Sequence, residues 1–132
     1  MESNSHFIGR TYKPDEVIYQ QGDTGETMYL VGHGLVEILQ RRSDKEYCLG
    51  TLREGDFFGE MALFGYTTRT ATARAGPEGA VVLTLEKKSF LKRLHYDPSM
   101  AFDMMKKMAD RIEHLESVLV TAGEALLPIE LE

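Results

Sequence analysis

The sequence predicts a mainly β fold, a roll or sandwich of short strands, followed by one long C-terminal helix. Eleven of the 12 glycines lie before residue 80, and glycine supplies the tight turns that a protein of short strands needs repeatedly. After Glu86 the short apolar runs between turn residues give way to a helical periodicity that meets no glycine until Gly123. The change of pattern predicts a β-rich part followed by helices.

The predicted strands are short runs rich in β-branched and aromatic residues. They recur at a spacing of roughly 8–15 residues with turn residues between them, which is typical of a sandwich or a roll. The runs are residues 16–20, 28–31, 35–39, 46–49, 70–75 and 80–85. The polar stretch 21–26, which contains two glycines, is predicted to be the turn between the first two strands.

Two helices are predicted after the strands. Ser89 is a candidate cap for a short helix over residues 90–95. Asp97 and Pro98 place a capping residue and a proline at the start of a longer helix. We expect the longer helix to run to about Val120 and to end before Gly123.

Length and composition limit the class of protein. The 132 residues suffice for one domain over 1–132, with a β-roll at about 7–87 and C-terminal helices at about 89–122. The net charge of -6 argues against a nucleic-acid-binding surface spread over the domain, and the single Cys48 excludes an intrachain disulfide. No apolar run approaches the roughly 18–20 residues of a membrane span, so we expect a cytoplasmic protein with no membrane segment.

The segment 55–75 carries the functional signal. A glycine-flanked turn leads into a short predicted helix, Glu60–Phe64, and the start of a helix offers backbone N–H groups to an anion. The Arg69 guanidinium that follows can make a two-pronged contact with a phosphate. The Glu60 carboxylate would repel a phosphate, so its expected partner is a hydroxyl donor such as a ribose 2′-OH. The combination suits a small sugar phosphate.

Residues 58–72, here called the cassette, resemble the phosphate-binding cassette of cyclic-nucleotide-binding domains. In that family Phe-Gly-Glu-(Leu/Met)-Ala-Leu is followed by Arg-x-Ala-(Ser/Thr), and both halves occur here, at 58–63 and 69–72. Residues 22–31 and 34–38 resemble the family's Gly-Asp turn and Gly-x-Val-Glu-Val strand. The resemblance covers most of the chain and extends to catabolite activator proteins and regulatory subunits of protein kinase A.

The resemblance implies an eight-stranded β-roll whose ligand is a cyclic nucleotide. Arg69 would hold the phosphate oxygens beside the N–H groups of Met61 and Ala62, Glu60 would accept the ribose 2′-OH, and the Thr70 hydroxyl would lie near the phosphate or the base. Ile38, Leu49 and Met61 are the expected apolar wall against the base. The expected ligand-binding residues are Gly59, Glu60, Met61, Ala62, Arg69, Thr70, Ile38 and Leu49. No catalytic residue, metal ligand or cofactor is expected.

The sequence departs from the family at three places. Thr68 stands where many members have a proline before the arginine, and the helical segment that usually precedes the roll is missing or reduced to residues 1–9. No helix-turn-helix follows the long helix, so we expect no DNA binding by this chain. We expect a non-catalytic sensor module of a larger bacterial protein. We expect cyclic AMP to be preferred over cyclic GMP. The hydroxyl residue Thr70, directly after Arg69, nevertheless resembles family members that respond to cyclic GMP.

Other interpretations stand beside this one. The alternative to ligand contact by Glu60 and Arg69 is a structural ion pair between them. Thr72 could either pack within the fold or contact the ligand. A degenerate roll that only dimerises or binds a partner is the alternative function. A metal-dependent enzyme of the cupin type needs a His-x-His motif, which the sequence lacks. Cys48 is expected to be a buried, inert thiol because no basic residue of the kind that activates a thiol lies near it.

The long helix carries a heptad pattern of apolar residues, here called the seam. Its members follow each other at spacings of 4, 3, 4, 3 and 4: Ala101, Met105, Met108, Ile112, Leu115 and Leu119. Such a pattern predicts a helix pair, and the family resemblance implies a parallel homodimer. A helix folded back as a lid on its own monomer is the alternative. Phe102 and Met104 lie off the seam and are expected to pack against the roll.

Overall fold

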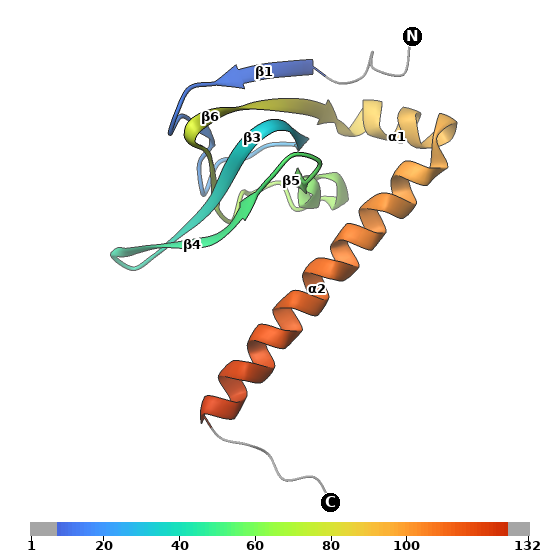
Figure 1. Ribbon diagram of the computed structural model, residues 1–132. Helices are drawn as coiled ribbons and strands as arrows, with labels where there is room; N and C mark the ends of the chain where they lie inside the picture. The colour runs from blue at the N-terminus through green and yellow to red at the C-terminus, as the bar shows by residue number, and fades with distance from the viewer. Residues whose placement is uncertain (1–7, 127–132) are drawn as a thin grey trace, which may run out of the picture. The chain divides into compact units, whose positions relative to one another are not determined.

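The computed structural model describes residues 8–126 and shows a β-rich part followed by two helices (Figure 1). The chain forms two compact units, residues 1–96 and 97–132. In chain order the elements are β1 (Ile8–Tyr12), β2 (Val17–Tyr19), β3 (Thr27–Arg42), β4 (Lys45–Leu52), β5 (Phe57–Phe58), the 3₁₀ helix η2 (Glu60–Phe64), β6 (Thr72–Glu86), α1 (Lys87–Tyr96) and α2 (Pro98–Leu126). The predicted fold, a β-roll with C-terminal helices, is confirmed.

Two long antiparallel strands, β3 and β6, form the centre of the sheet and lie side by side in Figure 1. The strand order is β1-β6-β3-β4, with β2 also paired to β6 and β5 to β3. The β3–β6 register shifts between Val31 and His33 and again between Gly34 and Val36. Such irregularities bend and twist paired strands, so these two strands take part in more than one side of the roll.

The division into strands differs from the prediction. The described residues contain six strands rather than eight. Runs 28–31 and 35–39 are parts of β3, and run 80–85 and most of run 70–75 belong to β6, because the intervening glycine-containing stretches bend each strand without ending it. The strands β1 and β5 were not predicted, since neither has a pattern of its own that separates it from a loop.

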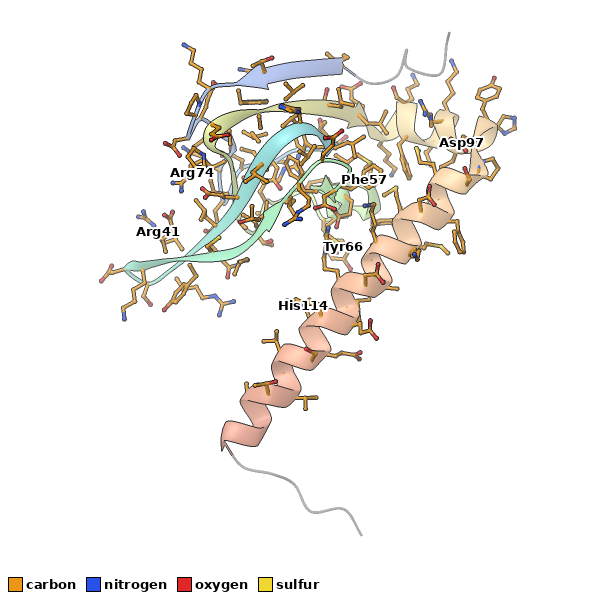
Figure 2. All side chains as sticks on the ribbon, in the orientation of Figure 1. Arg41, Phe57, Tyr66, Arg74, Asp97 and His114 are labelled. Atoms are coloured by element: carbon orange, nitrogen blue, oxygen red, sulfur yellow. The ribbon has the colours of Figure 1, made fainter. Side chains whose placement is uncertain are left out.

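The core of the roll lies on the alanine face of β6. Ala73 and Ala75 are fully buried, whereas Arg74 between them points the other way and bonds Glu37 on β3 at 2.9 Å (Figure 2). This hydrogen bond raises the pKa of the Arg74 guanidinium. The buried cluster consists of Tyr12, Val31, Val36, Phe58, Ala73, Ala75, Ala80 and Val82. Thr72, which alternates with these alanines, therefore lies on the outward face of the strand.

The predicted start of the first helix is wrong, and that of the second is correct. Helix α1 begins at Lys87, so Ser89 lies inside it and is not its cap. Helix α2 begins at Pro98 as predicted, and the Met100 N–H donates to the Asp97 carbonyl in its first turn. It continues past Gly123 to Leu126 because a single glycine weakens a helix without having to end it.

Most of the seam on α2 is exposed. The exposed fractions are 62% for Met105, 57% for Ile112, 55% for Leu115 and 69% for Leu119. Off the seam, Met104 is buried and Phe102 is 64% exposed. None of the helices within residues 8–126 has the length and apolarity needed to cross a membrane.

Candidate functional site

The short helix η2 separates an inward carboxylate from an outward apolar side chain. It lies between Gly59 and Gly65, both in the left-handed conformation, and it contacts β3. Glu60 is buried with an exposed fraction of 7%, while Met61 is 52% exposed. The Ala62 N–H donates to the Gly59 carbonyl at 3.3 Å, a long bond near the outer limit for this type. Two of the three η2 residues predicted to bind ligand therefore face opposite sides of the helix.

Arg69 is buried next to η2. Its exposed fraction is 6%, its Nη1 donates to the Gly59 carbonyl at 3.3 Å and its Nη2 donates to the Thr27 carbonyl at 2.8 Å. The guanidinium carbon also lies 4.4 Å from the ring centre of Tyr19 and 5.6 Å from that of Tyr29, within range of a cation–π contact. The two carbonyls occupy two of the five guanidinium N–H groups, which leaves N–H groups for an anion.

The turn between β2 and β3 fixes the backbone on both sides of Arg69. The Arg69 N–H donates to the Asp23 carbonyl and the Arg69 carbonyl accepts from the Gly22 N–H, each at 2.8 Å. Thr24 and Thr68 form a β-bridge one residue further along. This short ladder restrains the loop at the position where Thr68 replaces the family's proline.

Two glycines, which have no side chain, make room for the Arg69 guanidinium. A Cβ atom added to Gly25 would lie 2.6 Å from Arg69 Nη2, and one added to Gly59 would lie 3.0 Å from Arg69 Nη1. Both distances are too short for unstrained packing. Sequence reasoning treated Gly25 only as a turn residue, because only the folded chain shows that residues 25 and 69 are neighbours. The Gly-Asp turn motif was the signal that pointed to this region.

Two of the three residues predicted to contact the base, Ile38 and Leu49, lie on β3 and β4. Ile38 pairs with Gly50 while Leu39 pairs with Cys48, so Leu49 is the extra residue of a bulge beside Ile38. Ile38 packs against the core cluster, and Leu49 is 57% exposed. The structure therefore brings Ile38 and Leu49 together on adjacent strands. The third predicted wall residue, Met61, lies on η2 with the other cassette residues.

The hydroxyl residues after Arg69 have separate roles. Thr70 is exposed, and its carbonyl accepts a hydrogen bond from Gln40 Nε2 on β3 at 3.0 Å. Thr72 is half-buried and its Oγ accepts from the Gln21 N–H at 2.9 Å, which favours the packing interpretation for Thr72. Sequence reasoning missed Gln40 entirely, because nothing in the local pattern of β3 marks it as a neighbour of the cassette.

Cys48 corrects one expectation. It is exposed rather than buried, and its Sγ lies 3.6 Å from the Gly50 carbonyl. Cys48 pairs with Leu39 just beyond the bulge at Leu49, and this break in the alternation of β4 could not be predicted from the sequence.

Comparison with known proteins identifies the family. The family model described as "Cyclic nucleotide-binding domain" matches residues 9–97, which include β1 to β6 and the whole cassette. The chain belongs to the cyclic nucleotide-binding domain family. The match covers the roll and α1 and ends at Asp97, directly before α2 begins.

Relatives of the domain include proteins named for each cyclic nucleotide. It is 32% identical over 124 residues to the cyclic AMP receptor protein of Thermus thermophilus, covering 92% of this chain and 57% of that protein. It is 39% identical over 83 residues to the cGMP-dependent protein kinase egl-4 of Caenorhabditis briggsae, covering 61% of this chain and 11% of the kinase. The chain thus spans little more than half of the first relative and about a tenth of the second.

A solved structure agrees with the fold. The crystal structure of the Thermus thermophilus catabolite activator protein superposes with a TM-score of 0.80 at 30% identity. The superposition covers 92% of this chain and 57% of that one. The similarity therefore extends through the β-roll and into the C-terminal helices.

Proposed function

We propose that this domain binds cyclic AMP, and cyclic GMP more weakly, as a non-catalytic sensor module. The observation that carries the proposal is the buried Arg69, which is anchored by two carbonyls and two aromatic rings next to the buried Glu60. A buried cation gains most from a ligand that brings a compensating negative charge.

The two charged residues have complementary roles in this proposal. Arg69 holds the exocyclic phosphate oxygens together with the Met61 and Ala62 N–H groups. The long bond from the Ala62 N–H to the Gly59 carbonyl is readily shared with a phosphate oxygen. Glu60 accepts the ribose 2′-OH, so a nucleotide without that hydroxyl binds more weakly.

Some observations favour cyclic AMP as the ligand and others favour cyclic GMP. Relatives named for cyclic AMP and for cyclic GMP are both similar to this chain, and the Thr70 hydroxyl is a candidate partner for the guanine 2-amino group. The long match to the cyclic AMP receptor protein, which covers 92% of this chain, favours cyclic AMP.

Calorimetric titration of the whole chain with each nucleotide tests the proposal. We expect saturable binding of both, with cyclic AMP binding more tightly. Absence of binding by either nucleotide would contradict the sensor function and favour the degenerate roll. A cyclic GMP affinity more than tenfold above that of cyclic AMP would reverse the proposed preference.

We propose further that α2 joins two copies of the chain through the seam. Met105, Ile112, Leu115 and Leu119 are more than half exposed, and a sustained a/d pattern of this kind is stable only when a partner helix covers it. A homodimer through α2 would bury these residues and bring two nucleotide-binding domains into one molecule.

A further inference from the structure

Gln40 lies where the β3–β6 ladder stops and the cassette begins. The last paired residues of the two strands are Leu39 and Thr72. Beyond this pair no ladder bond is available for the Thr70 carbonyl, and the Gln40 side chain supplies one, with Nε2 at 3.0 Å. The side chain thus extends the sheet by one bond into the cassette.

The orientation of the Gln40 amide is fixed by its second partner. Arg42 Nε donates to Gln40 Oε1 at 2.7 Å. Because a guanidinium only donates hydrogen bonds, the amide oxygen must face Arg42 and the amide NH₂ must face the Thr70 carbonyl. Gln40 is half-buried, and both of its hydrogen bonds lie at the surface.

The Thr70 peptide is thereby held at both ends. The carbonyl of Arg69, on its N-terminal side, accepts from the Gly22 N–H at 2.8 Å, and the carbonyl of Thr70 itself accepts from Gln40. With both peptide planes fixed, the direction of the Thr70 Cα–Cβ bond is fixed too. Thr70 itself is exposed on this frame.

We infer that Gln40 is a positioning residue for Thr70 and, through it, a determinant of selectivity between cyclic GMP and cyclic AMP. The inference rests on the proposed function, in which the Thr70 hydroxyl serves the guanine 2-amino group. Without the Gln40 donor the Thr70 peptide can rotate, and a hydrogen bond from the guanine amino group loses its partner. Cyclic AMP has no 2-amino group, so its affinity depends less on this geometry.

The experiment compares two variants with a matched control. Gln40→Met removes the side-chain hydrogen bonds while keeping a side chain of nearly the same length. Gln40→Glu places a carboxylate oxygen against the Thr70 carbonyl. Gln21→Met is the control, because Gln21 bonds the backbone of Arg41 in the same part of the sheet and not the Thr70 carbonyl. Arg41 lies toward the far end of the β3–β4 hairpin (Figure 2). Each variant is titrated calorimetrically with cyclic AMP and cyclic GMP, alone and combined with Thr70→Val.

We expect Gln40→Met and Gln40→Glu to weaken cyclic GMP binding about fivefold or more, the effect of one lost hydrogen bond, and cyclic AMP binding less. In the Thr70→Val background the cyclic GMP effect should shrink below about twofold, because the two residues act as a unit. The Gln21→Met control should leave the ratio of the two affinities unchanged.

Three results would overturn the inference. Unchanged cyclic GMP binding by both Gln40 variants would do so and leave the sensor function intact. An equal loss for both nucleotides that persists with Thr70→Val would show a general structural role instead. Absence of nucleotide binding by the unmodified chain would remove the proposed function and the inference with it.

Discussion

The environment of Arg69 explains how one residue can dominate the site. The guanidinium contacts two backbone carbonyls and lies over the Tyr19 ring, and neutral partners of this kind orient a cation without neutralising it. Burial raises the pKa of the neighbouring Tyr29, and the positive charge of Arg69 opposes that rise. The Arg69 side chain is therefore held in one orientation, as the proposed contact with a phosphate requires.

Glu60 gives a prediction that concerns the sugar. A hydrogen bond to a charged acceptor is worth about 1.5–3 kcal/mol, so 2′-deoxy cyclic AMP should bind about tenfold or more weakly than cyclic AMP. In Glu60→Gln this penalty should shrink, because a neutral amide oxygen accepts a weaker bond. Competition of the two nucleotides for the unmodified and variant proteins measures both effects. Equal binding of the two nucleotides by the unmodified chain would remove Glu60 from the site.

The spacing of the motif predicted the charged residues of the candidate site, but not the residues that hold them in place. Glu60 and Arg69 were predicted because the cassette places them at a distinctive spacing. Gly25 and Gln40 were not, since each meets the cassette only after distant segments pair. The Thr27 carbonyl, which accepts a hydrogen bond from Arg69, belongs to the backbone. Any residue type could supply it, so no local sequence pattern could have predicted it.

At the scale of the elements, strand positions were predictable and strand ends were not. The alternation of Ala71, Ala73 and Ala75 with polar residues predicted a strand, but parity alone did not say which face is inside. The structure answers this, because Ala71, Ala73 and Ala75 are all buried. Strands β3 and β6 were divided at glycines that in the folded chain are bends.

The α2 seam leads to a prediction about assembly. Ile112→Glu places a charge in the middle of the seam and should dissociate the proposed dimer, whereas Ser117→Glu adds the same charge on the opposite side of the helix and should not. Sedimentation at micromolar concentration measures both. A monomeric unmodified chain, with and without nucleotide, would contradict the dimer and support the lid.

At the scale of the whole molecule, the net charge of -6 bears on how the proposed site would attract an anion. An acidic protein repels small anions at long range, so binding of a phosphate must come from local contacts within the cassette. In the proposed site the contact comes from Arg69, which is buried, and salt screens a buried interaction less than one at the surface. We therefore expect nucleotide affinity to depend on one arginine more than on the overall field.

The most direct measurement of this account is calorimetric titration of cyclic AMP into the unmodified chain and into Arg69→Ala, with Arg69→Lys as the charge-conserving control. Truncating one partner of a buried charge pair costs about 2–5 kcal/mol, so Arg69→Ala should bind roughly 30-fold to several thousand-fold more weakly. Arg69→Lys should also bind poorly, because a point charge cannot reproduce the two-pronged contact. Binding of cyclic AMP by Arg69→Ala within about threefold of the unmodified chain would contradict the assignment of the cassette as the nucleotide site.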